Sequence, residues 1–216
     1  MEIRRARRTD NLGLVALIYS AGPELYDYLY KTDKSSAQDY ITFEFLSGRG
    51  FCGYPNVTVA LRDRQIVGTG CFYDAARYGR LALGTAWNMF RFYGPIGFWP
   101  VLKRSLHIGS VMKKPGPGEL YLSNFGVARE HRSTGVGRAL INTRLAVAKA
   151  RGYQRFGLDV ADNNPRAEQL YRQLGLQEVE FKQFTGKRKD MHIPNSKKME
   201  LRLAQSPATQ PLQQAA

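Results

Sequence analysis

The sequence predicts a single α/β domain in which a mixed, mostly antiparallel sheet is flanked by helices. Its 216 residues suit one hydrophobic core, and a hydrophobic content of 43% with 12% aromatic residues is typical of a globular chain. Short runs that alternate apolar and polar residues predict strands, and apolar residues three and four positions apart predict the helices between them. These patterns favour a layered, folded domain over a disordered chain.

The first predicted elements are a strand and two helices. Residues 3–6 can open as a strand, and Asp10 is expected to cap a helix that Gly22 ends. A second helix is expected at 36–46, with Gly48 beyond its end. Apolar residues at helical spacing give each helix one inward face.

A β-hairpin and a long helical stretch follow. Residues 57–61 and 66–73 are rich in β-formers and are separated by a short polar turn, which predicts two antiparallel strands. Residues 74–114 have mainly helical spacing, with a break at Gly94 and Pro95. This stretch forms a helical insertion between the third and fourth predicted strands.

The following segment has the order strand, helix, strand, helix. Strands are expected at 119–127 and 156–160, with a helix at 135–150 between them. A short helix then begins at Pro165, which suits the first helical position, with Asn164 as its cap.

Two strands at 176–181 and 198–203 complete a domain that spans residues 1–203. The tail at 204–216 is rich in Gln, Pro and Ala and is expected to be disordered.

The chain is strongly basic, with a formal net charge of +14 from 32 Lys and Arg residues against 18 Asp and Glu residues. Such a surface attracts polyanions, including nucleic acid, anionic lipid and phosphorylated cofactors. The basic residues are dispersed along the sequence, so the simplest interpretation is a solvated basic surface. This pattern does not favour nucleic acid as a partner.

The cysteines and histidines indicate neither a disulfide framework nor a metal site. Cys52 and Cys71 have no partner at metal-ligand spacing, and His107, His131 and His192 are not spaced with them as ligands. The N-terminus lacks the apolar core of a signal peptide, and charged, Gly and Pro residues interrupt the apolar run in the insertion. We therefore expect a cytoplasmic protein without a transmembrane segment.

The segment Arg132-Ser133-Thr134-Gly135-Val136-Gly137 carries the first indication of chemistry, since it lies between a predicted strand and the start of a helix. A helix start offers free backbone N–H groups, and glycines let a phosphate approach them closely. Two glycines before a helix also suit a tight turn, so the segment alone leaves both interpretations open. The three-glycine dinucleotide fingerprint is incomplete, and the phosphate loop ending in Gly-Lys-Ser/Thr is absent.

The flanking sequence decides between these interpretations. After the helix and the next strand comes the run Asn164-Pro165-Arg166-Ala167-Glu168-Gln169-Leu170-Tyr171-Arg172-Gln173-Leu174-Gly175-Leu176. The loop and this run together resemble the GNAT family of N-acetyltransferases. In that family the loop has Arg or Gln, two residues, Gly, one residue, then Gly or Ala, and Asn, Ala, Leu-Tyr and Gly-Phe follow later. The specific resemblance covers about residues 119–181, and Leu176 replaces the family's frequent Phe.

The resemblance implies a GNAT fold with acetyl-CoA as co-substrate and no metal. Backbone groups of the loop would hold the pyrophosphate. The residues of this loop are Arg132, Ser133, Thr134, Gly135, Val136, Gly137 and Arg138. The exposed backbone of Phe125 and Val127 would pair with the pantetheine arm like an added strand, and Asn164 would bind along the same arm.

Tyr171 and Glu119 are the candidate catalytic residues. A phenol with a pKa of about 10 is protonated at neutral pH, so Tyr171 can supply a proton to the leaving sulfur. Alternatively, Tyr171 serves only to pack in the hydrophobic core. Glu119 begins the strand before the loop, where the family often carries a Glu, although Tyr121 lies nearer the expected place. Alternatively, Glu119 is a surface carboxylate at the end of a strand, and an ordered water acts as the base.

The predicted activity is transfer of an acetyl group from acetyl-CoA to an amine acceptor on a small molecule or protein. Direct attack in a ternary complex is expected, because neither cysteine lies in the matched segment. The alternative is a non-catalytic module that binds CoA, or nucleic acid through its basic surface.

The insertion at 74–114 carries more aromatic residues than a connection requires. We expect it to help define the acceptor pocket, with Phe90, Phe98 and Trp99 in contact with the acceptor. The alternatives are a homodimer contact, an enlarged core, and a peripheral membrane contact through Lys103 and Arg104.

Overall fold

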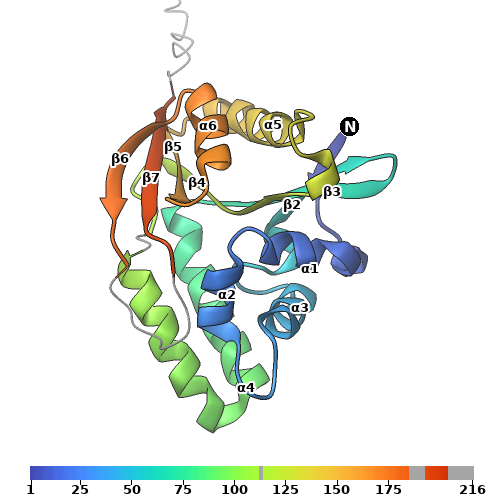
Figure 1. The fold of residues 1–216 in the computed structure, drawn as a ribbon, viewed down its shortest axis with the longest axis vertical. Helices are drawn as coiled ribbons and strands as arrows, with labels where there is room; N and C mark the ends of the chain where they lie inside the picture. Colours follow the sequence, from blue (N-terminus) through green and yellow to red (C-terminus); the bar gives the residue numbers. More distant parts are fainter. Residues whose placement is uncertain (112–113, 185–192, 204–216) are drawn as a thin grey trace, which may run out of the picture.

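A computed structural model describes residues 1–111, 114–184 and 193–203 and contains a seven-stranded sheet in the order β1-β2-β3-β4-β5-β7-β6 (Figure 1). Its strands are β1 (Glu2–Arg5), β2 (Val57–Arg62), β3 (Gln65–Tyr73), β4 (Glu119–Val127), β5 (Arg155–Ala161), β6 (Gln177–Lys182) and β7 (Ser196–Arg202). Neighbouring strands pair antiparallel except β4 and β5, which are parallel. The sheet is therefore mixed and mostly antiparallel, as predicted.

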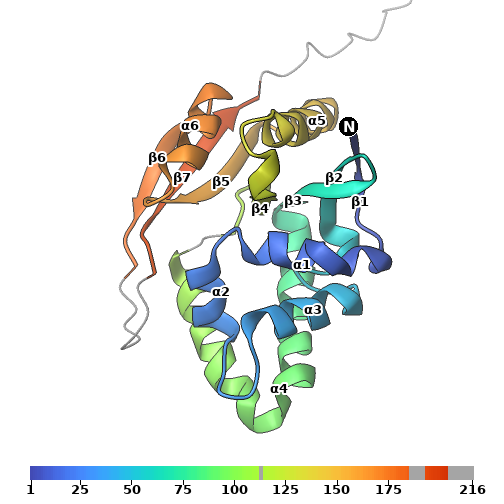
Figure 2. The same ribbon diagram turned by 45° about the vertical axis from the view of Figure 1, so that its right-hand side comes forward.

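Helices cover both faces of this sheet (Figures 1 and 2). One face carries α5 (Val136–Ala150) and α6 (Pro165–Gln173). The other carries α1 (Asn11–Tyr19), α2 (Pro23–Tyr30), α3 (Ala37–Ser47) and the long α4 (Ala75–Val111). Short 3-10 turns, η1 (Arg8–Asp10), η2 (Tyr54–Asn56) and η3 (Arg129–His131), lie in the connections.

Each face has its own apolar core. On the α1 to α4 side, Leu14, Ile18, Tyr40, Ile41 and Phe45 are fully buried together with residues of β2. On the other side, the core contains Leu140 and Ile141 of α5, Phe156 and Leu158 of β5, and Leu176 and Met199. Because apolar side chains are buried on both faces of the sheet, β4 and β5 are held between the two layers of helices.

The parallel pair β4 and β5 separates partway along its length. Pairing runs from Glu119 opposite Arg155 to Leu122 opposite Leu158 and then stops, while β3 continues to pair with β4 as far as Val127. Asn124 adopts a left-handed backbone, with a φ of 53°, just past the last β5 pair. The edge of β4 that faces β5 is thus left without a strand partner, among the described residues, from Ser123 onward.

Most predicted elements agree with the structure to within one or two residues, and the structure also contains one helix that was not predicted, α2. Asp10 occupies the N-cap position of α1, as expected, but its carboxylate does not bond the first turn of that helix. It accepts hydrogen bonds from the backbone N–H of Arg7, at 2.6 Å, and from the Arg4 side chain. The predicted disorder of 204–216 concerns residues outside the described ranges.

The insertion between β3 and β4 is helical, as expected, and is bent at Gly94, where φ is 70°. Met89, Val101 and Ile108 of α4 join the core formed with α1 to α3. The insertion thus forms a two-armed hairpin that packs against the other helices on this face (Figures 1 and 2).

Candidate active site

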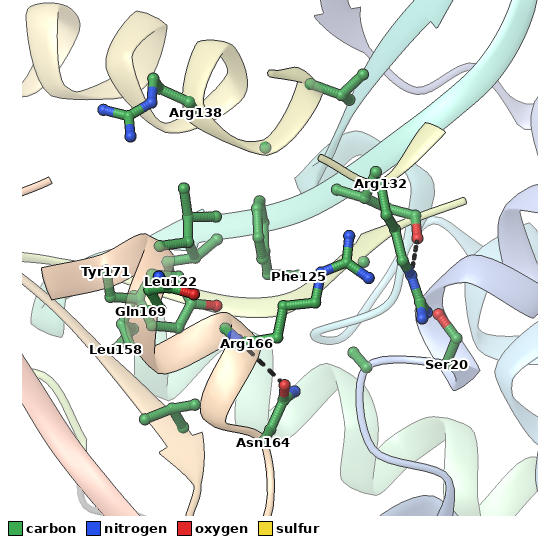
Figure 3. Close-up of a pocket in the computed structure, with 18 of the residues that line it drawn as sticks. Ser20, Leu122, Phe125, Arg132, Arg138, Leu158, Asn164, Arg166, Gln169 and Tyr171 are labelled. Carbon is green, nitrogen blue, oxygen red and sulfur yellow. Dashed lines mark hydrogen bonds between the residues drawn. The ribbon is translucent and has the colours of Figure 1, made fainter. Parts of the chain in front are cut away.

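A cleft of about 500 Å³ opens where β4 and β5 separate (Figure 3). Its walls come from β4, β5, the loop before α5 and the N-terminal end of α5, one side of α6, and the chain after α1 at Ser20 and Ala21. The position follows from the fold, because at this point the sheet leaves backbone groups of β4 unpaired next to a helix N-terminus.

The N-terminus of α5 provides a site for an anion. Ser133 and Gly135 both have positive φ, at 62° and 85°, and no side chain caps the helix. The Ala139 N–H donates to the Gly135 carbonyl at 3.0 Å, so the N–H groups of the residues just before Ala139 have no carbonyl partner within the helix and point out of its end. Consecutive N–H groups at such a turn bind phosphate well.

Three arginines surround this helix end. Arg132, Arg138 and Arg166 all line the cleft, and Figure 3 shows their side chains on either side of Phe125. The Arg132 Nε donates to the Val127 carbonyl at 3.1 Å, and the Arg166 guanidinium lies 3.3 Å from the Ser133 hydroxyl. This end of the cleft is therefore positively charged and suited to a polyphosphate.

Packing against β4 explains the second glycine of the loop. A Cβ on Gly137 would lie 3.0 Å from the Phe125 ring, 3.2 Å from Leu170 and 3.5 Å from Val127. Gly137 therefore lets α5 lie directly on the two β4 residues predicted to meet the pantetheine arm. By contrast, a Cβ on Gly135 would meet no atom within 4 Å, so this glycine is required by its φ and not by contacts.

The helix α6 brings two predicted residues to the cleft. Asn164 caps the helix by accepting a hydrogen bond from the Ala167 N–H at 3.2 Å, which leaves its amide NH₂ to face the cleft. Tyr171 also lines the cleft, is 5% exposed, and packs on the Phe125 ring with the centroids 6.1 Å apart. Burial raises the pKa of the Tyr171 hydroxyl, so it stays protonated at neutral pH.

Asp159 is a cleft residue that the sequence analysis did not identify. It is the one carboxylate among the described residues that line the cleft. Two donors hold its carboxylate: the Lys182 ammonium donates to it at 2.9 Å and the Tyr121 hydroxyl donates to it at 2.7 Å. The side chains of Asp159 and Lys182 are almost fully buried. A buried carboxylate with two such donors has a fixed position beside the opening between the strands.

Two predicted site residues do not line the cleft. Glu119 is buried at the start of β4, where its carboxylate accepts from the Gly116 N–H at 2.7 Å and pairs with Lys198 at 3.2 Å. These contacts give it a structural role at the closed end of the β4 and β5 pair. Thr134 points back to its own turn, donating to the His131 carbonyl at 2.8 Å.

The expectation that the insertion forms part of the acceptor pocket is wrong. No described residue of α4 lines the cleft. The rings of Phe90, Phe98 and Trp99 contact one another across the Gly94 bend. The bend of α4 lies at the end of the hairpin far from α5 and α6 (Figures 1 and 2). Helical spacing identified the apolar residues of this segment but not which of its faces packs inward.

The fold is that of an acetyltransferase. The model of the acetyltransferase (GNAT) family matches residues 22–176, and the chain belongs to this family. Among curated protein sequences, none matches the chain.

Solved acetyltransferases share the fold. The N-acetyltransferase from Staphylococcus aureus Mu50 is 17% identical, with a TM-score of 0.67 over 93% of this chain and 100% of its own. The ribosomal-protein-alanine N-acetyltransferase from Brucella melitensis is 19% identical, with a TM-score of 0.56 over 94% of this chain and 100% of its own. Family and fold together support an N-acetyltransferase activity in general terms.

Proposed function

We propose that the protein transfers an acetyl group from acetyl-CoA to an amine, on a small molecule or a protein, by direct attack in a ternary complex. The observation that carries the proposal is the cleft itself, in which an unpaired strand edge runs toward an uncapped, arginine-flanked helix N-terminus. An extended amide-containing arm that ends in a polyphosphate fits both features.

The residues of the cleft divide the binding of acetyl-CoA between them. The N–H groups around Ser133 to Arg138 would hold the pyrophosphate, assisted by the side chains of Arg132, Arg138 and Arg166. The unpaired β4 edge at Phe125 and Val127 would pair with the amides of the arm, and the Asn164 amide would donate to the same arm. When bound, the co-substrate supplies an activated acyl group as a thioester.

Tyr171 would supply the proton to the departing sulfur. Tyr171 lines the cleft and packs against Phe125, and burial keeps its hydroxyl protonated. The amine would form the new C–N bond, the C–S bond would break, and the Tyr171 proton would pass to sulfur. The proton that the nitrogen loses on forming the amide would return to the tyrosinate, directly or through water. A neutral donor at this place favours the thiolate as a leaving group.

Asp159 takes the place that the sequence analysis gave to Glu119. An ammonium acceptor must lose a proton before attack, since a lysine-like amine has a pKa of about 10.4. Asp159 lines the cleft, whereas Glu119 is enclosed by Lys198 and the Gly116 N–H. We propose that Asp159, whose charge is balanced by Lys182, positions an ordered water that accepts the proton of the acceptor amine.

The cysteines support direct attack. Cys52 and Cys71 are buried in the core on the α1 to α4 side and do not line the cleft. Burial raises the pKa of the Cys71 thiol to about 12, and it also raises that of Cys52, so neither forms the thiolate that an acyl-enzyme would need.

The test is Tyr171→Phe, with Tyr153→Phe as the matched control. Tyr153 is a partly buried phenol that donates to Asp74 and lies outside the cleft lining. With acetyl-CoA and a panel of amines, we expect Tyr171→Phe to lower kcat by about 100-fold or more without changing CoA affinity, because the ring is kept and only the proton donor is lost. Tyr153→Phe should leave kcat unchanged.

Two outcomes would contradict the proposal. Unchanged kcat in a folded Tyr171→Phe protein would remove the acid role. CoA binding by the wild-type protein without turnover of any amine would instead favour a non-catalytic CoA-binding module.

A further inference from the structure

The insertion exposes a row of large apolar side chains that no other part of the described chain covers. We define the α4 surface as Leu83, Trp87, Phe90, Ile96, Trp99 and Leu106, all exposed. Ile96 is 90% exposed and Trp99 is 67% exposed, which is unusual for side chains of this size. Both tryptophans of the chain belong to this surface.

The two arms of α4 contribute to one continuous patch. Trp87 stacks on Phe90 at 6.0 Å, Phe90 meets Phe98 edge-on at 5.7 Å, and Phe98 meets Trp99 at 5.3 Å. This chain of ring contacts crosses the Gly94 bend from one arm to the other. Because Leu83 lies four residues before Trp87 and Leu106 lies seven after Trp99, they extend the patch along each arm.

The charged residues of α4 are all basic. Residues 75–111 contain no Asp or Glu. Arg80, Arg91 and Lys103 are exposed and lie three or four residues from Leu83, Trp87 and Trp99 respectively, at helical spacing with the apolar row. On the adjoining α3, the carboxylate of Asp39 accepts a hydrogen bond from the Ser36 N–H at 2.8 Å, as part of the cap of its own helix.

This charge pattern favours an anionic partner for the α4 surface over a second copy of the chain. A second copy of the chain would bring Arg80, Arg91 and Lys103 against themselves with no acidic partner on the patch, in a protein that carries a net charge of +14. An anionic surface pairs with these cations, and tryptophan is the side chain best suited to the boundary between lipid headgroups and acyl chains. No described helix is long and apolar enough to cross a bilayer.

We propose that the α4 surface docks the protein on the face of an anionic lipid bilayer. Trp87, Phe90 and Trp99 enter the headgroup layer, and Arg80, Arg91 and Lys103 pair with lipid phosphates. A cytoplasmic protein would meet an anionic leaflet of this kind. In Figures 1 and 2 the bend of α4 lies at the opposite end of the molecule from α5 and α6, so docking leaves the cleft open to acetyl-CoA.

The first experiment uses tryptophan fluorescence of the full-length protein, which reports on this surface alone. Vesicles of phosphatidylcholine containing phosphatidylglycerol should shift the emission to shorter wavelength and carry the protein down on sedimentation. Vesicles of phosphatidylcholine alone should do so weakly, and added salt should reduce binding to the anionic vesicles.

Variants measured by sedimentation assign the effect to the surface. Trp87→Ala combined with Trp99→Ala should weaken binding about 10-fold or more, since each ring loses its burial in lipid. The matched control is Phe181→Ala, which removes an exposed ring on β6. Arg80→Gln, Arg91→Gln and Lys103→Gln together should weaken binding on the order of 100-fold.

A second control removes the same charge elsewhere. Arg8, Lys34 and Lys149 are exposed and lie outside α4, and changing all three to Gln should weaken binding far less than the α4 triple variant. Equal losses in the two triple variants would overturn the proposal, because they would show only a general attraction of the basic chain.

Other results would also overturn it. Absence of binding to anionic vesicles would refute membrane docking. Self-association that depends on Trp87 and Trp99 would assign the surface to a second copy. Binding to duplex DNA at physiological salt that is lost in the tryptophan variant would assign it to nucleic acid.

Discussion

Replacing Gly135 with alanine tests the anion site at α5 with little change to the packing. An alanine Cβ at this position would meet no protein atom within 4 Å, so the methyl group would stand in the open space of the cleft. The φ of 85° costs an L-residue roughly 1–2 kcal/mol of the free energy of unfolding. The structural perturbation is therefore small and confined to the loop.

The effect on CoA binding should be larger than this strain. A phosphate oxygen must come within about 3 Å of the N–H donors, and the methyl group occupies part of that approach. Losing one charge-assisted hydrogen bond costs about 1.5–3 kcal/mol, which raises Kd for CoA roughly 10-fold to 100-fold. Isothermal titration calorimetry with CoA measures this change directly.

Gly152→Ala is the matched control. Gly152 follows the C-terminal end of α5, has a φ of 75°, and likewise has no atom within 4 Å of an added Cβ. Urea unfolding should show a similar loss of stability in both variants, whereas only Gly135→Ala should weaken CoA binding. A Kd for Gly135→Ala within about twofold of the wild-type value, in a folded protein, would refute the pyrophosphate assignment.

Three further predictions concern stability. The hydrogen bond from Arg4 lowers the pKa of the Asp10 carboxyl in the folded protein, so the ionised carboxylate stabilises the fold. Above a pH of about 4 the Asp10→Asn variant should therefore be less stable than the wild type by the full amount. The difference in the free energy of unfolding should fade as the pH falls through the lower folded-state pKa, and unfolding measured across an acid titration would show this. Lys182→Met leaves the buried carboxylate of Asp159 unpaired and should lower the free energy of unfolding in urea by about 3–5 kcal/mol, a loss that a change of under 1 kcal/mol would contradict. Ser36→Ala removes the capping hydroxyl of α3 and should cost about 1 kcal/mol in the same assay, whereas an unchanged midpoint would show that the cap contributes nothing.

The elements that carried strong local signals were predictable from sequence. The run from Asn164 has a cap, a Pro at the first helical position and apolar residues on one face, and the structure confirms the helix and the hydrogen bond from the Ala167 N–H to the cap. The β2 and β3 hairpin was likewise evident from its alternation. In these segments local propensity and tertiary packing favour the same structure.

Other features depend on contacts that sequence patterns do not encode. The helix α2 has only eight residues, and its tyrosines are held by partners far along the chain, as in the hydrogen bond from Tyr26 to Asn124 at 2.6 Å. Asp159 was missed because it lies within a buried strand, and it reaches the cleft only because β4 and β5 separate next to it. Loop and helix motifs thus identified the expected cofactor side of the cleft, whereas the candidate acceptor-side carboxylate required the three-dimensional arrangement.

The bent insertion has a consequence for chain connectivity. Its two ends join β3 and β4, which are neighbours in the sheet, and Tyr73 at the end of β3 pairs with Tyr121 near the start of β4. A short link could therefore replace the whole hairpin with little cost in loop-closure entropy. Deleting it would nevertheless uncover the core residues that contact Met89, Val101 and Ile108. The Gly94 bend is thus a better place than the sheet for new chain termini: a circular permutant opened there would break no strand pairing and would keep both arms packed.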